Sequence, residues 1–187
     1  MAKFFGNLHL VLLAALVLAL VVIFAVPANT TEEQAVLRWL HLFFGITWIG
    51  LLYYFNFVQI PTMPKVPAEL KPGVSKYIAP SALFFFRWGA ALTVLTGLII
   101  AWRSDYLVQA LTLDPVHRLI GIGMWLALIM AFNVWFVIWP NQKKALGLVP
   151  AEDAEKAKAA TTAMIFSRTN TLLSLAMLYC MINFNGG

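Results

Sequence analysis

The sequence predicts an all-α integral membrane protein with five transmembrane helices, the last four forming a tandem helical-hairpin pseudo-repeat. Of its 187 residues, 61% are hydrophobic and 11% are charged, and the mean hydropathy is +0.82. Five apolar runs reach the roughly 20 residues that a helix needs to cross a hydrocarbon core of about 30 Å. They cover about residues 7–27, 37–60, 80–102, 118–140 and 161–183. We therefore expect a single membrane domain over residues 1–187, with no separate soluble domain.

The first run has some features of a secretory signal peptide. Lys3 precedes it, and small residues lie near its end. However, its apolar core from Leu8 to Val26 is longer than the roughly 7–15 residues of a typical signal core. We therefore expect this run to be a retained transmembrane helix that stands outside the repeat.

The other four runs contain the same set of residues twice, in the same order. The first half covers about residues 37–102 and the second about residues 118–183. The matched pairs are His41 and His117, Gly45 and Gly121, Trp48 and Trp125, Asn56 and Asn133, Pro61 and Pro140, and Arg87 and Arg168. The second half has one extra residue before its tryptophan. Two tandem helical hairpins explain this pattern.

Basic residues are distributed unequally between the two ends of the predicted helices. One end has only Arg38, Arg103 and Arg118. The other end has eight: Lys3, Lys65, Lys71, Lys76, Lys143, Lys144, Lys156 and Lys158. Because basic loops stay in the cytoplasm, we predict a multi-pass protein of the bacterial inner membrane with a cytoplasmic N-terminus and a periplasmic C-terminus. The net charge of +5 then reflects topology and contact with anionic lipid, and not nucleic acid.

The duplicated histidines predict a b-type haem near the periplasmic side. His41 and His117 lie at similar depth on helices of the same direction, so they can supply two axial imidazoles and are the candidate metal ligands. Six further residues complete the predicted haem site. Gly45 and Gly121 would let the macrocycle lie close to the backbone. Arg38 and Arg118 would pair with the propionates, and Trp48 and Trp125 would pack against the macrocycle. The alternative is that both histidines are interfacial and hydrogen-bonded to loops. A covalently attached haem is excluded because the chain has one cysteine, Cys180, and no CxxCH.

A second polar layer is predicted towards the cytoplasmic side. It contains Arg87, Arg168, Asn56 and Asn133. Ionisable residues inside a membrane usually face the bundle interior and pair with another group, which suggests a site for an anion or a quinone carbonyl. Two alternatives remain. The arginine side chains extend to the headgroups, or the polar side chains of this layer form hydrogen bonds with backbone groups that Pro61 and Pro140 leave unpaired.

Several function classes lack their motifs in this chain. It has no Walker loop, no GxGxxG after a strand, no HExxH and no serine nucleophile elbow. None of the five apolar runs contains Asp or Glu, which argues against a proton-coupled pump or a cation channel. No catalytic residue is assigned.

The segment from His41 to Pro61, HLFFGITWIGLLYYFNFVQIP, resembles the urate oxidase N-terminal family. The stretches around Arg87 and Arg168 and from Trp125 to Pro140 are similar to the same family, so the resemblance covers about residues 37–183. In that family the domain precedes a cytochrome c in a bacterial urate dehydrogenase. This chain has no cytochrome c domain and is shorter than the family's full membrane domain, so the resemblance does not imply urate oxidation.

The helix with His41 also looks distantly like HemJ-type protoporphyrinogen oxidases and copper-resistance D membrane proteins. Histidines of that wider group are associated with haem b, which the resemblance carries over to His41 and His117. The expected function is electron transfer to a periplasmic carrier. For this function the chain would be a redox subunit of a membrane oxidoreductase, with assembly into a homo-oligomer as the other possibility. Two rivals stay open: a non-catalytic accessory subunit that packs against other membrane subunits, and an anion transporter or channel.

Overall fold

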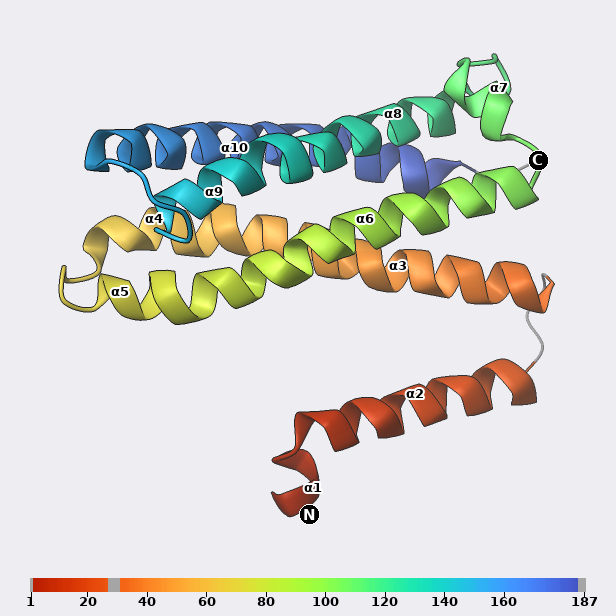
Figure 1. Ribbon diagram of the computed structural model, residues 1–187. Coiled ribbons are helices and arrows are strands. Elements are labelled where there is room, and N and C mark those ends of the chain that lie inside the picture. Colours follow the sequence, from red (N-terminus) through yellow and green to blue (C-terminus); the bar gives the residue numbers. More distant parts are fainter. Residues whose placement is uncertain (1, 27–30, 185–187) are drawn as a thin grey trace. The chain divides into compact units, whose positions relative to one another are not determined.

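The computed structural model describes residues 2–26 and 31–184, and these are helical with no strand (Figure 1). Within these described residues, five helices are long and apolar enough to cross a membrane. They are Leu8–Ala25, Glu32–Lys65, Lys71–Arg103, Arg118–Ala145 and Asp153–Asn183. The number of long apolar helices predicted from the sequence is therefore confirmed. The chain divides into two compact units, Met1–Trp39 and Leu40–Gly187, and each is described by itself.

The first unit contains α1 (Ala2–Phe5), α2 (Leu8–Ala25) and the beginning of α3 (Glu32–Tyr53). The side chain of Asn7 caps α2 by accepting hydrogen bonds from the backbone N–H groups of His9 (3.1 Å) and Leu10 (3.3 Å). Taken by itself, α2 buries none of its side chains. A helix that is apolar on every side suits a lipid environment.

In the second unit, four long helical segments run alongside one another (Figure 1). The first continues α3 into η1 (Tyr54–Gln59), α4 (Ile60–Thr62) and η2 (Met63–Lys65). The second consists of α5 (Lys71–Gly73), η3 (Val74–Ile78) and α6 (Ala79–Arg103). After the short α7 (Leu107–Leu111), the third consists of α8 (Arg118–Phe132), η4 (Asn133–Ile138) and α9 (Trp139–Ala145). The fourth is α10 (Asp153–Asn183), which packs along α8 and α9.

The last four long helices extend further than the apolar runs that predicted them, whereas α2 lies within its predicted run of about 7–27. α10 begins at Asp153, eight residues before the predicted boundary at 161. Asp153 and Glu155 lie in its first turn, where acidic side chains interact favourably with the helix dipole, and Lys156 contacts Asp153 at 2.9 Å. Polar residues thus continue the helix beyond its apolar part, which hydropathy cannot show.

Three π-helical segments stand directly before prolines. The residues that precede Pro61, Pro80 and Pro140 donate their N–H groups to carbonyls five residues back: Ile60 to Phe55, Ala79 to Val74, and Trp139 to Val134. A proline ring inside a regular α-helix collides with the carbonyl four residues before it. The wider turn relieves that collision, so each helix continues past its proline.

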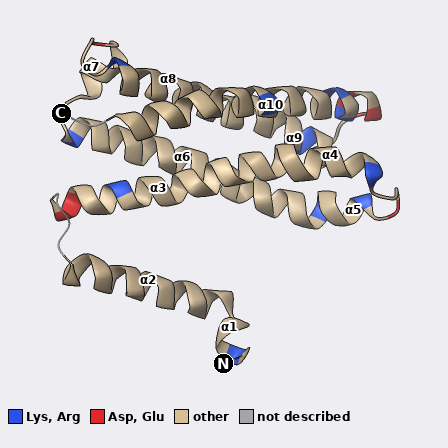
Figure 2. Cartoon of the chain, turned by 180° about the vertical axis from the view of Figure 1, so that it is seen from behind, with Lys and Arg blue, Asp and Glu red and all other residues tan. Residues whose placement is uncertain are grey.

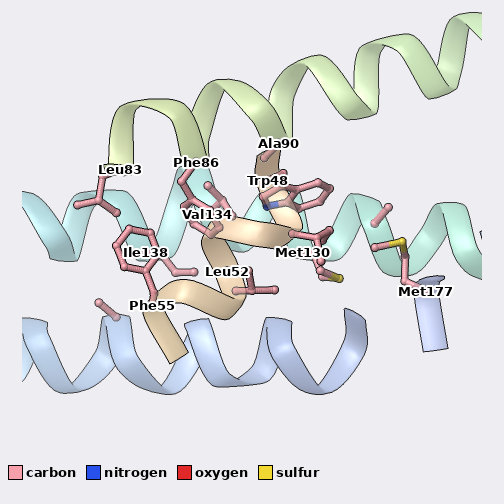
Figure 3. Packing of buried hydrophobic residues seen from close by; sticks show 13 residues of the cluster. Trp48, Leu52, Phe55, Leu83, Phe86, Ala90, Met130, Val134, Ile138 and Met177 are labelled. Carbon is pink, nitrogen blue, oxygen red and sulfur yellow. The ribbon is translucent and has the colours of Figure 1, made fainter. Parts of the chain in front are cut away.

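The core of the second unit joins all four long helical segments (Figure 3). Its fully buried centre contains Trp48 and Leu52 of α3, Phe86 of α6, and Met130 and Val134 from the third segment. Gly89 of α6 lets the backbones of α3 and α6 approach closely, because a Cβ there would lie 3.2 Å from the backbone nitrogen of Trp48. A smaller cluster of Ala101, Ala110, Ile120 and Met124 fixes α7 against α6 and α8.

Candidate functional site

His41 is held on α3 by one face of α6. Its Nδ1 atom lies 2.9 Å from the carbonyl oxygen of Thr93 and 3.2 Å from Oγ1 of Thr96. A carbonyl oxygen can only accept a hydrogen bond, so Nδ1 carries the hydrogen and donates it. In this neutral tautomer the lone pair is on Nε2, which remains available for a ligand.

The local sequence of α6 explains why it receives an imidazole. Thr93, Thr96 and Gly97 lie three and four residues apart and therefore share one face of the helix. The hydroxyls of Thr93 and Thr96 donate to carbonyls of their own helix, those of Gly89 and Leu92, each at 2.7 Å. Because its hydrogen is used in this way, Oγ1 of Thr96 can only accept from His41.

Gly97 provides the space for the imidazole ring. A Cβ at this position would lie 2.9 Å from Cε1 and 3.3 Å from Nδ1 of His41. Any larger residue would displace the ring. Gly97, Thr93 and Thr96 were not predicted from the sequence. A Thr-x-x-Thr-Gly segment in an apolar helix does indicate close packing against a polar side chain.

His117 occupies a different environment, directly before α8. Its ring stacks on Tyr106 at 5.7 Å with an interplanar angle of 10°, and it also contacts Phe184 at 6.0 Å. Its Nδ1 atom is buried without a hydrogen-bond partner, and Oδ1 of Asp114 lies 3.6 Å away, too far for a hydrogen bond. The contacts of the two histidines thus come from different elements. Among the described residues, no group of three or more His, Cys, Asp or Glu side chains could hold a metal ion.

The paired glycines are not equivalent in the structure. At Gly45 a Cβ would make an ordinary contact of 3.8 Å with Cγ2 of Thr93. At Gly121 a Cβ would collide with the carbonyl oxygen of Ala110 and lie 2.9 Å from Leu113. The close backbone approach at Gly121 is therefore made by the end of α7.

The paired tryptophans and the outer arginines also differ from one another. Trp48 is fully buried in the core, and its Nε1 has no hydrogen-bond partner. Trp125 is 46% exposed, and its Nε1 donates to the carbonyl of Leu111 at 3.0 Å. Arg38 belongs to the first unit, whereas Arg118 begins α8 in the second, where it is exposed.

The residues of the predicted inner layer have separate partners. The guanidinium of Arg87 lies 3.4 Å from the ring centroid of Trp139, whereas Arg168 is exposed. Asn56 donates to the carbonyl of Leu52 (2.9 Å) and to Oγ of Ser167 (2.8 Å). Asn133 donates to Oδ1 of Asn170 at 2.9 Å. Both asparagines therefore bond to α10, while Arg87 faces α9.

A buried polar stripe on α10 was not predicted from the sequence. It consists of Ser167, Asn170 and Ser174, which are spaced by three and four residues and all buried. Besides the two asparagines, it binds Tyr53, whose hydroxyl lies 2.9 Å from Oγ of Ser174. Asn170 also donates to the carbonyl of Met130 at 2.9 Å. Hydrogen bonds of this kind join helices in membrane proteins.

Comparison with protein families finds a match over part of the chain. Residues 113–185, which include α8, η4, α9 and all of α10, match the model of the urate oxidase N-terminal family. The resemblance predicted from the sequence is confirmed for this part of the chain. No curated protein and no solved structure shows significant similarity to the chain.

Proposed function

We propose that the chain is an integral protein of the bacterial inner membrane with five spanning helices and a cytoplasmic N-terminus. Large apolar side chains on the outer faces of the long helices, such as Leu42, Phe85, Leu172 and Leu175, support the membrane placement. The lysines of the second unit gather at the end that contains α5 and α9 and the beginning of α10 (Figure 2). The positive-inside rule assigns that end to the cytoplasm.

The last four spans are proposed to be two copies of one helical hairpin. Each copy has a π-helical turn before its proline, Pro61 in the first and Pro140 in the second. In each copy the matched asparagine, Asn56 or Asn133, donates a hydrogen bond to α10. The shared backbone distortion supports an origin of the two halves from one repeating unit, whereas the asparagines differ, since the bond of Asn56 joins the two copies and that of Asn133 lies within the second.

Within this bundle, we propose that the chain binds b-type haem through His41. The observation that carries this proposal is the hydrogen bond from Nδ1 of His41 to the carbonyl of Thr93. Histidines that bind metals almost always donate their other ring N–H to a carbonyl or carboxylate, which fixes the tautomer and orients the ring. His41 therefore fits an axial ligand that coordinates iron through Nε2.

His117 is the proposed second axial ligand. Stacking on Tyr106 restrains its ring, and Asp114 is the carboxylate nearest to Nδ1. A modest movement would let Nδ1 donate to Asp114, which leaves Nε2 for the iron as at His41. The filled space at Gly121 means that a haem would not lie along that glycine, whereas an added Cβ at Gly45 would meet Thr93 only at 3.8 Å.

One-electron transfer is the proposed activity. A bound haem would supply a one-electron redox centre, and two histidine ligands would leave no open iron position for oxygen chemistry. The role of the protein is to orient the imidazoles, through Thr93 and Thr96 at His41 and through Tyr106 at His117. The electron donor is proposed to be a quinone or a small reductant, and the acceptor a periplasmic carrier.

The test is the reduced-minus-oxidised visible spectrum of the purified full chain, produced with haem supplied during growth. We expect a Soret band and a split alpha band that are lost in His41→Ala and in His117→Ala. His9→Ala is the matched control, because His9 is an exposed histidine of the first unit. A colourless wild-type protein would overturn haem binding. Loss of the spectrum in His41→Ala alone would overturn the role of His117.

An accessory subunit is the second candidate, and α2 is the observation that favours it. This helix lies outside the repeat, and its span has a mean hydropathy of 3.0, the highest of the five. Such a helix can pack against another membrane subunit as well as against lipid. Co-purification of a colourless chain with other membrane proteins, lost when residues 1–26 are deleted, would favour this function over electron transfer.

A further inference from the structure

Arg87 is a half-buried cation, and one of its hydrogen-bond donors is buried and unused. Its guanidinium lies 3.4 Å from the centroid of the Trp139 ring. Its Nη1 atom is shielded from solvent and has no hydrogen-bond partner. A buried donor without an acceptor is costly, more so when it is charged, and cation–π contact does not satisfy its N–H groups. No described residue accepts a hydrogen bond from the guanidinium, and the part of it that is not buried is open to an oxygen acceptor from outside the chain.

A second cation faces the same indole. Nζ of Lys143, on α9, lies 5.6 Å from the centroid of the Trp139 ring, and this side chain is half-buried. No acidic side chain of the described residues pairs with Arg87 or Lys143. Two positive charges around one aromatic ring repel each other unless an anion lies near both. The missing acceptor is therefore expected to be an oxyanion.

The position of the two cations in the fold indicates where this oxyanion comes from. Trp139 begins α9, which lies at the lysine-rich end of the bundle (Figure 2), and the guanidinium of Arg87 from α6 reaches this tryptophan. The indole of Trp135 donates to the carbonyl of Arg87 at 3.1 Å, which holds α6 against the third helical segment. Tryptophans and basic side chains gather at the headgroup level of a membrane, where the phosphates of lipids are the abundant oxyanions.

We propose that Arg87, Lys143 and Trp139 bind the phosphate of an anionic phospholipid in the cytoplasmic leaflet. The guanidinium donates to the phosphate oxygens, the ammonium of Lys143 adds charge, and Trp139 holds both cations in place. An anionic headgroup neutralises the two charges, which a zwitterionic headgroup with its own ammonium does less well. The inference goes beyond the proposed haem function and involves neither histidine.

The experiment measures lipid binding to the purified full chain in neutral detergent, by native mass spectrometry and by the thermal midpoint. The probes are phosphatidylglycerol, phosphatidylcholine and inorganic phosphate. The variants are Arg87→Gln and Lys143→Gln. The matched controls are Arg168→Gln, the exposed repeat counterpart of Arg87, and Lys144→Gln, the exposed neighbour of Lys143.

We expect phosphatidylglycerol to bind and to raise the thermal midpoint of the wild type more than phosphatidylcholine does. Each test variant should bind phosphatidylglycerol about fivefold more weakly, as for the loss of one basic contact near an anionic surface, and each control should bind like the wild type. If Arg87→Gln fails to fold, Lys143→Gln decides the result. Equal binding of both lipids, or equal weakening in the controls, would overturn the site. An Arg87-dependent response to inorganic phosphate alone would overturn the lipid in favour of a free phosphate.

Discussion

The backbone carbonyl of Thr93 accepts a hydrogen bond from Nδ1 of His41 at 2.9 Å and thereby sets the tautomer of that histidine. Because the acceptor belongs to the backbone, no side-chain substitution at position 93 removes it. The ring is controlled by the packing distance between α3 and α6, and that distance depends on the small residues of α6. Gly97 is the position where this dependence can be tested directly.

Gly97→Ala is expected to displace the imidazole of His41. The new Cβ would lie 2.9 Å from Cε1, closer than real contacts allow, and overpacking of this kind costs about 1–3 kcal/mol. We expect a lower thermal midpoint and, if His41 binds haem, a lower haem content per chain. Gly50→Ala is the control, since a Cβ there meets nothing within 4 Å. Equal haem content and stability in both variants would contradict the role of Gly97.

The two glycines that the repeat pairs are expected to respond differently to alanine. Gly121→Ala brings a Cβ against the carbonyl of Ala110, and a backbone atom cannot move aside as a flexible side chain can. We expect a loss of about 1–3 kcal/mol in the free energy of unfolding. Gly45→Ala, with an ordinary contact of 3.8 Å, should change it little. Chemical denaturation of the two variants in the same detergent gives the comparison.

The sequence predicted the long helices because a membrane span requires a minimum length of apolar residues. It could not predict their ends, since helices such as α10 continue through polar turns. It could not predict α7 either, because five residues are too few to give a periodic pattern. This omission matters, since α7 supplies the atoms that fill the space at Gly121.

The contacts of the candidate site were even harder to predict from the sequence than the helix ends. His41 and His117 were selected because the repeat pairs them, and a repeat predicts equivalent positions in the chain. Their partners depend on tertiary packing: α6 surrounds His41, whereas Tyr106 and Phe184 surround His117. The arginines also diverge, with Arg87 on Trp139 and Arg168 exposed. Duplication identifies which residues to examine, but the contacts that distinguish the two copies come from outside the repeated motif.

Tyr53→Phe tests one end of the polar stripe on α10. Ser174 uses its hydroxyl hydrogen for the carbonyl of Thr171 at 2.7 Å, so the hydroxyl of Tyr53 must be the donor in the 2.9 Å contact between the two side chains. Its removal leaves the shape of the core intact, and we expect a loss of about 0.5–1.5 kcal/mol in the free energy of unfolding. Tyr179→Phe, at an exposed position, should have no measurable effect. A similar loss in both would show that the contact adds nothing.

The hydrogen bond between Asn133 and Asn170 is expected to couple the third helical segment to α10. Asn170 is fully buried and also donates to the carbonyl of Met130 at 2.9 Å, so Asn170→Ala removes that hydrogen bond and leaves the buried side-chain amide of Asn133 without its acceptor. We expect this variant to lose about 1–3 kcal/mol of stability. Asn183→Ala is the control, because the exposed Asn183 bonds only to Tyr179 of its own helix.

A double-mutant cycle separates the pair itself from these other losses. With Asn133→Ala, Asn170→Ala and the double variant, the coupling energy should be about 0.6 kcal/mol and below about 1.7 kcal/mol, the range found for hydrogen bonds between membrane helices. The double variant then loses less stability than the sum of the single variants, because the second substitution removes a partner that is already unpaired. If the losses of stability in the two single variants add up to that of the double variant, each asparagine acts through a different contact. The three positions of the stripe on α10 would then form independent hydrogen bonds and not a coupled network.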